Sequence, residues 1–500
     1  MLPFHALARG TASRYDAIVV GSGVGGCVSA ALLAEAGARV LVLERNRRAG
    51  GILASVRRDG FKMDLGSHLI SRGAKGPLGQ VLRMLGLCSP RFLTHRIPLR
   101  SRGMFAATAP ERRSGLIRVG VQVARDLELP PREIAHLARL LFQIFTLTEP
   151  ELRLWDRRTL ADFIGQHTDH PAAYFLMSFM ASIFFVLPPW RVAAGESIRC
   201  LRWLLRDYSL SYVEGGMDQL AHALLRFVQA RNGEVVLGAE VVRVFHGRRG
   251  WIAATRDGCE YEAKAICCNL APCDLLRLVD PGALPPWWVA RARAIVPSGN
   301  AHQLKVALRR PLVEEGCVIG GVSLQGLTLR DLSIGLMERA VTDIDAGRVS
   351  DPLAIYAPVP TNYDPTLAPG GRQLIVASVY GPTRRDPEDG IEVWKDRSLR
   401  ALAQLVPGLL DEMLFCEFMP VPQVGRWMGK SGNGAISNGQ VPGQVGRDRL
   451  PVDVPLPGLY LCGDGAGGRG IGTELAAESG MEAAQAIVSN VLSAARREAA

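Results

Sequence analysis

The sequence has few of the features that mark a disulfide-rich domain, a zinc protein or a serine hydrolase. Its ten cysteines form no CxxC pair, and no GxSxG motif is present. His167 and His170 are separated by two residues, but no third histidine or cysteine stands near them at ligand spacing. A core of this size needs no disulfide bonds, and a zinc site takes three or four protein ligands. We therefore expect reduced cysteines and no bound metal.

A secretory signal is also missing from the sequence. The first sixteen residues contain no apolar stretch of the required length, so we expect a cytoplasmic protein. Residues 171–190 are twenty consecutive uncharged residues, which is long enough for a candidate membrane span. They include two serines and a tyrosine and end in Pro-Pro-Trp. We predict a helix that is buried or dips into a membrane surface and lines an apolar pocket, with a true span as the weaker alternative.

Positive charge is concentrated in one part of the chain. The net charge is +10, and residues 91–139 hold ten arginines against four acidic residues. Leucine, isoleucine and valine accompany these arginines, whereas a nucleic-acid groove would offer aromatic side chains for base stacking. We expect no nucleic-acid partner. A solvated charged face and a contact with an anionic membrane surface stay open, so the protein could be a peripheral membrane protein.

Glycine is abundant, with 54 residues in a chain of 500, and its positions define the first motif. An apolar run ending at Val20 precedes Gly21, Gly23 and Gly26, and an Ala- and Leu-rich segment then leads to a second apolar run ending at Glu44. This is a βαβ unit in which the first glycine permits a tight turn, the second admits a pyrophosphate and the third packs helix on strand. The terminal carboxylate can bind a ribose, and NAD or FAD would fit.

A second glycine-rich loop occupies residues 463–472 and repeats the GxGxxG spacing. Only 28 residues follow Gly472, and most have helical character, so no second βαβ unit can be completed. We predict that this loop returns to the first sheet and presents a helix N-terminus to the same dinucleotide.

These motifs, with RRAGG at 47–51, YVEGGMDQLA at 212–221 and GEVVLGAEVVRV at 233–244, occur in a recognisable order along the chain. In this order they resemble the branch of the FAD-dependent amine oxidase superfamily that contains phytoene desaturases, carotenoid isomerases and retinol saturases. The C-terminal stretch at 458–480 completes the likeness, except that Arg469 stands where the common pattern has proline. That departure puts the shape of the active site in question.

The resemblance implies an α/β fold in which a Rossmann-type, glutathione-reductase-like FAD-binding domain is interleaved with an α+β substrate domain. The expected FAD-binding domain combines residues 14–110, 212–275 and 430–500. The substrate or membrane-facing domain combines residues 111–211 and 276–429. A chain of 500 residues exceeds one ordinary core, which agrees with two domains.

The resemblance also implies which residues hold FAD. The glycines of the first loop would meet the pyrophosphate, Glu44 the ribose, and Val241 the adenine through its backbone. Arg48 and the glycine pair after it would lie at the phosphates and the flavin side, and the C-terminal loop would reach the ribityl chain and the ring. The full set is Gly21, Gly23, Gly25, Gly26, Glu44, Arg45, Arg48, Gly50, Gly51, Gly66, Ser67, Val241, Gly463, Asp464, Gly472 and Thr473.

Three side chains are candidates for a catalytic role. Lys305 lies in a strand-like run, where related flavoenzymes place a lysine near the flavin N5; the alternative is an exposed lysine at a strand edge. His68 follows a Gly-Ser turn and is equally a candidate structural histidine. Glu474 starts the C-terminal helix, where a carboxylate also stabilises the helix dipole.

The expected reaction follows from what the flavin region lacks. Amine oxidases of the superfamily flank the flavin with an aromatic pair, yet residues 463–481 contain no aromatic residue, which disfavours an amine substrate. Apolar segments elsewhere suit a lipophilic isoprenoid or polyene. We expect a desaturase that passes hydride to the flavin N5, with a quinone or oxygen as the undetermined final acceptor. The alternatives are a saturase or cis-trans isomerase, an amine-oxidase-type flavoenzyme, and a catalytically inactive FAD-binding scaffold.

Overall fold

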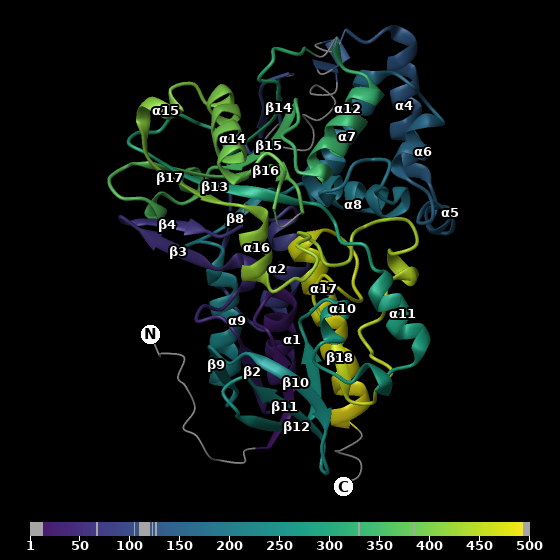
Figure 1. Cartoon of the computed structure of the whole chain (residues 1–500), viewed down its shortest axis with the longest axis vertical. Helices are drawn as coiled ribbons and strands as arrows, with labels where there is room; N and C mark the ends of the chain where they lie inside the picture. The colour runs from purple at the N-terminus through teal and green to yellow at the C-terminus, as the bar shows by residue number, and fades with distance from the viewer. Residues whose placement is uncertain are drawn as a thin grey trace.

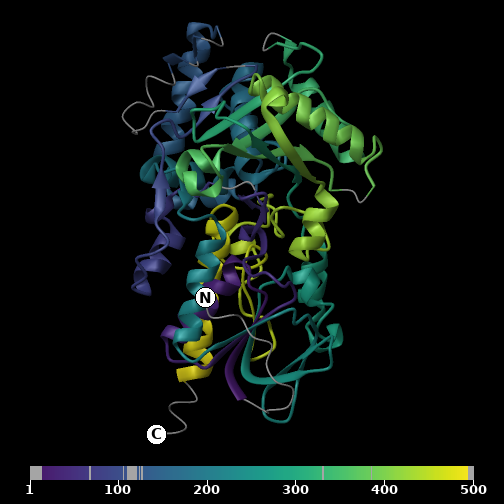
Figure 2. The same cartoon turned by 90° about the vertical axis from the view of Figure 1, so that its left-hand side faces the viewer.

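The computed structural model describes residues 14–66, 69–104, 106–109, 121–122, 124–125, 128–328, 331–383 and 386–493. The molecule is elongated and has two lobes, each built around one large sheet (Figure 1). The lower lobe holds the sheet expected from the glycine motif. Figure 2 shows that the two lobes meet at a waist, beside which helix α16 (Val421–Met428) lies.

The lower sheet has a parallel part assembled from distant segments. β9 (Glu234–Leu237), β2 (Val40–Glu44), β1 (Arg14–Val20), β12 (Glu260–Cys268) and β18 (Leu459–Leu461) lie side by side in this order. β10 (Val241–His246) and β11 (Trp251–Thr255) continue from β12 as an antiparallel meander. The expected βαβ unit is therefore present, and the C-terminal loop returns to the same sheet through β18.

Three helices cover one face of this sheet: α1 (Val24–Glu35), α9 (Asp218–Ala230) and α17 (Gly472–Ile487) (Figure 1). α1 packs between the other two because it is buried almost all round and rich in alanine. The two sides of the sheet contribute to separate apolar clusters. Cys267 belongs to the cluster under the helices and Cys268 to the cluster on the opposite face, as expected for small buried side chains on a strand.

The upper lobe contains a mixed seven-stranded sheet. Its order is β17 (Met413–Met419), β13 (Asn300–Leu308), β16 (Gln373–Gly381), β15 (Leu353–Pro358), β14 (Cys317–Val322), β6 (Arg100–Ser101) and β7 (Ala107–Thr108). The last two strands, β6 and β7, lie in the segment 14–110 that the sequence assigned to the FAD-binding domain. They come from the N-terminal segment, yet they pair with β14 because the chain crosses to the upper lobe before residue 100.

The remaining elements surround these sheets. The hairpin β3 (Ser55–Arg58) and β4 (Phe61–Asp64) and the pair β5 (Phe92–Thr94) and β8 (Ser211–Val213) lie near the waist. The other α-helices with both ends inside the described ranges are α2 (Pro77–Met84), α4 (Pro131–Thr146), α5 (Glu149–Trp155), α6 (Leu160–Gly165), α7 (Pro171–Phe185), α8 (Ala194–Asp207), α10 (Pro272–Leu275), α11 (Pro286–Ala294), α12 (Ile334–Ala346), α13 (Pro360–Tyr363), α14 (Ile391–Leu405) and α15 (Leu409–Glu412).

The uncharged segment at 171–190 forms the fifteen-residue helix α7 followed by a turn. Its Ser182, Ile183 and Phe184 line the main cavity, which agrees with a helix that borders an apolar pocket. Within the described part of the chain, no helix combines the length and the apolar character needed to cross a bilayer.

Candidate functional site

The two glycine-rich loops meet at the carboxyl ends of β1, β12 and β18. A Cβ added to Gly25 would lie 2.5 Å from the Gly463 backbone nitrogen and 2.6 Å from its Cα. Asn269, the residue after β12, lies between the loops, with its backbone N–H donating to Val20 O at 2.8 Å. A Cβ on Gly23 would lie 2.4 Å from the Asn269 side-chain amide nitrogen. These glycines are therefore required by contacts between loops as well as by any ligand.

Gly26 fulfils the packing role expected of the third motif glycine. A Cβ at this position would stand 2.0 Å from the Gly21 carbonyl oxygen, so only glycine lets α1 begin so close to the end of β1. The first turn of α1 carries no acidic residue, and it faces the cavity with Gly23 and Val24. This helix N-terminus is a favourable position for phosphate groups.

Glu44 ends β2 and is almost completely buried. One carboxylate oxygen, Oε2, accepts hydrogen bonds from the Ser22 backbone N–H at 2.8 Å and the Ser22 hydroxyl at 2.7 Å. The other oxygen, Oε1, accepts from the Asn46 backbone N–H at 2.8 Å. An ionised carboxylate has about four acceptor positions. Glu44 therefore braces the first loop and retains capacity for one ribose hydroxyl.

A continuous cavity of about 760 Å³ runs from this carboxylate into the upper lobe. Val241 lines its far end in the lower lobe, where the pairing of β10 with β11 shifts register between Val241 and Arg243. Asn269 lines the middle of the wall together with the two loops. Ile471, which precedes α17, and Tyr356 on β15 of the upper sheet also line the cavity. The cavity therefore extends to both elements.

Most of the predicted cofactor residues border this cavity or support its wall. Those that line it are Gly21, Gly23, Glu44, Arg45, Gly51, Gly66, Val241, Asp464, Gly472 and Thr473. Gly25, Gly26, Gly50 and Gly463 lie directly behind the lining. Arg48 is exposed and does not line the cavity, and its place at the phosphates stays a prediction. Ser67 and His68 lie outside the described residues.

Asp464 is held by a lysine from the turn that follows α16. The Lys430 ammonium donates to Asp464 Oδ2 at 2.5 Å, and Ser437 donates to the same carboxylate through its backbone N–H at 2.9 Å and its hydroxyl at 3.0 Å. Burial by itself would raise the pKa of Asp464, but the Lys430 charge and the Ser437 donors lower it below its ordinary value. The carboxylate is therefore ionised and fixed beside the cavity.

Arg45 connects the first loop to α16. Its guanidinium donates to the carbonyl oxygens of Arg426 and Trp427 at the C-terminal end of that helix. The Trp427 indole N–H returns a hydrogen bond to Gly51 O at 2.9 Å. A cation at a helix C-terminus is electrostatically favoured. The predicted cofactor residue Arg45 thus also ties the loop at 45–51 to the element that follows β17.

Lys305 is buried, which contradicts the alternative of an exposed edge lysine. β13 is an interior strand between β17 and β16, and Lys305 is only 2% exposed. Its ammonium donates to Leu65 O at 3.0 Å, directly behind Gly66 in the cavity wall. Burial lowers the pKa of Lys305 to about 7. The side chain supports the wall from behind and is not among the residues that line it.

Glu474 combines burial with access to the cavity. It lines the cavity, is 5% exposed, and accepts a hydrogen bond from the Arg72 backbone N–H at 3.1 Å. Burial raises the pKa of Glu474 to about 7, although the nearby Arg72 charge opposes this. Arg72 is itself paired with Asp207 at 2.6 Å. Glu474 can therefore hold or release a proton near neutral pH.

The raised pKa of Glu474 predicts a pH-dependent cost in stability. A carboxyl with a higher pKa in the folded state binds its proton more tightly there, so the stability falls as pH rises from 4.5 to about 7. Glu474→Gln should be more stable than wild type by about 1–3 kcal/mol at about pH 8 and nearly equal to it near pH 4.5. Urea unfolding at both pH values measures this; a difference that does not change with pH would contradict it.

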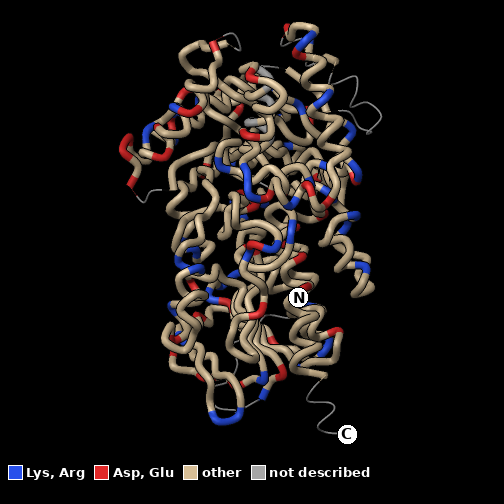
Figure 3. Tube along the Cα trace, turned by 90° about the vertical axis from the view of Figure 1, so that its right-hand side faces the viewer, with Lys and Arg blue, Asp and Glu red and all other residues tan. Residues whose placement is uncertain are grey.

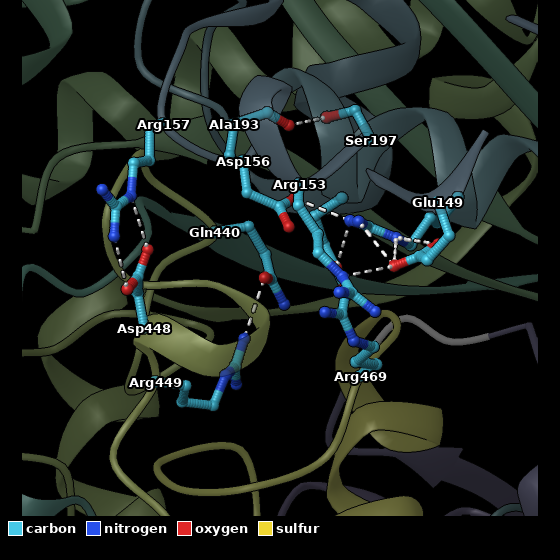
Figure 4. Close-up of polar contacts among 12 residues, drawn as sticks. Glu149, Arg153, Asp156, Arg157, Ala193, Ser197, Gln440, Asp448, Arg449 and Arg469 are labelled. Carbon is cyan, nitrogen blue, oxygen red and sulfur yellow. Dashed lines mark hydrogen bonds and ion pairs between the residues drawn. The ribbon is translucent and has the colours of Figure 1, made fainter. Parts of the chain in front are cut away.

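Arg469, the departure from the superfamily pattern, turns away from the cavity. Its guanidinium donates to Glu196 on α8 at 2.8 Å, and the Gly470 backbone N–H donates to the same carboxylate at 3.0 Å. Figure 4 shows Arg469 in a larger polar cluster in which Arg449 contacts Gln440. The arginine therefore fixes the C-terminal loop to the upper lobe and does not occupy the space beside Gly472.

The comparisons with known proteins agree with this geometry. The family described as flavin containing amine oxidoreductase matches residues 24–488. "All-trans-retinol 13,14-reductase" of Rattus norvegicus is 46% identical over 69 residues, which are 14% of this chain and 11% of that protein. "Prolycopene isomerase 2, chloroplastic" of an Oncidium hybrid cultivar is 24% identical over 511 residues, covering 91% of this chain and 80% of that protein.

Solved structures share the fold. An oxidoreductase from Methanosarcina mazei superposes with a TM-score of 0.68 at 18% identity, over 94% of this chain and 99% of the other. Putrescine oxidase bound to putrescine gives a TM-score of 0.65 at 18% identity, over 95% of this chain and 99% of the other. The predicted α/β fold with a Rossmann-type sheet and a second sheet is confirmed, as is the resemblance seen in the motifs.

Proposed function

Because the chain belongs to the family of flavin-containing amine oxidoreductases, we propose that it binds FAD in the cavity and oxidises or reduces carbon–carbon bonds of a lipophilic polyene. The cradle formed by the two glycine-rich loops at 21–26 and 463–472 fits a dinucleotide, as do the hydrogen-bonded Glu44 carboxylate and the N-terminus of α1. FAD supplies a two-electron acceptor or donor when bound. The residues of the chain hold it, orient the substrate and manage the accompanying proton.

The lining of the upper part of the cavity carries the substrate proposal. The residues contributed there by α7 and the upper sheet are uncharged, namely Ser182, Ile183, Phe184, Asn300, Ala301, Gln303, Ala354, Ile355, Tyr356, Ser378 and Tyr380. Glu474 is the carboxyl group at this end, and residues 463–481 supply no aromatic side chain. Ile183, Phe184, Ala301, Ala354 and Ile355 give this lining an apolar part that would accommodate an isoprenoid chain, which the hydroxyl and amide groups of the other residues would orient.

We assign to Glu474 the transfer of the proton that accompanies the hydride. Desaturation removes one hydrogen from carbon as hydride and the neighbouring one as a proton, which the Glu474 carboxylate would accept. Saturation reverses both transfers, so the protonated carboxyl would donate. The Arg72 backbone N–H holds one carboxyl oxygen, Oε1, and this leaves Oε2 for the substrate. A pKa of about 7 suits either direction near neutral pH.

Desaturation is the first candidate, and the names of the relatives favour a second one. A retinol reductase and a prolycopene isomerase are named for reduction and for isomerisation of polyenes. Either reaction would begin from reduced flavin and would require an external reductant. A saturase consumes that reductant with each turnover, whereas an isomerase does not.

Anaerobic spectroscopy of the FAD-loaded protein separates these candidates. A desaturase should lose its oxidised flavin absorbance when a saturated or partly saturated isoprenoid is added. A saturase should regain that absorbance when a polyene is added after chemical reduction, and an isomerase should convert the polyene without regaining it. Glu474→Gln should slow the proton-coupled reactions by about 100-fold or more. Bleaching of the flavin by polyamines alone would contradict the proposal. A flavin absorbance that changes with none of the compounds would also contradict it and would indicate a catalytically inactive FAD-binding scaffold.

A further inference from the structure

Helix α4 carries an apolar stripe on its solvent side. Ile134, Leu141, Phe142 and Phe145 are between 46% and 69% exposed. Their spacing along the helix places them on one side, while Leu140 and Ile144 are buried on the other. Four large apolar side chains gathered on one exposed helix indicate an interaction surface, because isolated apolar residues are the norm elsewhere on protein surfaces.

The charges on α4 indicate which kind of partner can bind this apolar stripe. Arg132 and Arg139 are exposed. Glu133, the acidic residue of the helix, is buried, accepts a hydrogen bond from the Thr168 hydroxyl at 2.6 Å and pairs with the Arg132 guanidinium at 3.1 Å. The outward side is therefore apolar with a positive border. A second copy of the chain would set arginine against arginine here, whereas an anionic lipid surface complements both features.

Other arginines of the basic segment are already used within the fold. Arg91 pairs with Glu214, and Arg100 and Arg102 both pair with Glu315. Over the side of the molecule that faces the viewer in Figure 3, Lys and Arg alternate with Asp and Glu. Within the described residues the positive charge at 91–139 is thus partly paired; on α4, Arg132 pairs with Glu133, and Arg139 adds an exposed charge.

A small apolar pocket lies under α4 and leads toward the main cavity. Ile144 of α4, Ala181 of α7 and Leu201 of α8 line it. Phe184 and Ile471 line this pocket and also the main cavity, so they separate the two spaces. The wall between α4 and the main cavity is therefore mainly apolar, and the pocket in it is small, at about 40 Å³.

We propose that the outward face of α4 docks on the surface of an anionic lipid bilayer. Phe142 and Phe145 enter the interface between headgroups and acyl chains, and Arg132 and Arg139 contact the headgroup phosphates. The lipophilic substrate then passes from the bilayer to the main cavity through the apolar wall beside this pocket; this second statement rests on the proposed function. The docking itself does not depend on which reaction the protein catalyses.

Flotation with vesicles tests the docking. The FAD-loaded full chain should bind vesicles of phosphatidylcholine mixed with phosphatidylglycerol about tenfold or more tightly than vesicles of phosphatidylcholine alone. Phe142→Ser with Phe145→Ser should weaken binding to both, and Arg132→Glu with Arg139→Glu should remove the preference for the anionic vesicles. Trp287→Ser, at a 58% exposed site on α11, is the matched control and should bind as wild type.

Two results would overturn the docking proposal. One is unchanged vesicle binding by the double phenylalanine variant. The other is absence of vesicle binding together with a dimer in light scattering that this variant abolishes, which would assign the surface to a second copy. Leu201→Trp, which fills the pocket, should slow turnover of a vesicle-embedded polyene without changing vesicle binding. An inactive protein that still floats with vesicles would reject the proposed function and retain the docking.

Discussion

Gly25→Ala is expected to leave the protein almost without flavin. The new methyl group would lie 2.5 Å from the Gly463 nitrogen, and since the obstacle is backbone it cannot rotate aside. The two glycine-rich loops would be forced apart at the point where the dinucleotide must enter. We expect flavin retention to fall by about 100-fold or more, equivalent to roughly 3 kcal/mol of binding free energy. Visible absorbance per chain after desalting measures the retained flavin.

Gly165→Ala is the matched control for this variant. Gly165 also lies in a helix, but a Cβ there has no neighbour within 4 Å. Alanine is the better helix former by about 1 kcal/mol in a helix interior, so propensity alone would favour both substitutions. The control should retain its flavin and melt at or above the wild-type temperature. Normal flavin content in Gly25→Ala would show that the loops do not need their close contact.

Asp464→Asn is expected to cause the second large loss. The substitution removes the charge opposite Lys430 and keeps one amide oxygen, which can accept from one of the two Ser437 donors. The two side chains are only 16% and 20% exposed, so the lysine would be left largely buried and unpaired. Breaking such a pair from one side costs about 3 kcal/mol of the free energy of unfolding. Urea unfolding at fixed FAD concentration measures this cost.

A double-mutant cycle identifies the source of this loss. If the unpaired ammonium is responsible, Lys430→Met should be much less harmful in the Asp464→Asn background than in wild type. The expected coupling is about 1–3 kcal/mol. Additive effects of the two substitutions would show that the ion pair contributes little and that Asp464 acts through Ser437 alone.

The parts of the site that the sequence predicts are local in the chain. Gly21, Gly23, Gly26 and Glu44 belong to one βαβ unit, whose spacing already determines the turn, the helix start and the carboxylate at the end of β2. The C-terminal loop was predicted to return to the same sheet because too few residues follow it for another βαβ unit. β18 and α17 confirm this prediction.

The parts that the sequence does not predict depend on pairing between distant segments. Asn269 enters the wall because β12 lies between β1 and β18, which no local pattern reveals. Lys430 meets Asp464 only when the turn after α16 folds back on the C-terminal loop. Arg469 points to Glu196 because α8 of the other lobe passes nearby. In each case a polar side chain acquires its role from a contact made across the fold.

The arrangement of the lower sheet also governs when flavin can be captured during synthesis. β1 and β2 leave the ribosome early, but β18 and the start of α17 are made roughly 400 residues later. At about 5–20 residues per second, the cradle stays half-built for tens of seconds. Gly463, Asp464 and Gly472 are absent throughout that interval. The site for the cofactor is therefore completed only at the end of translation, when β18 pairs with the free edge of β12.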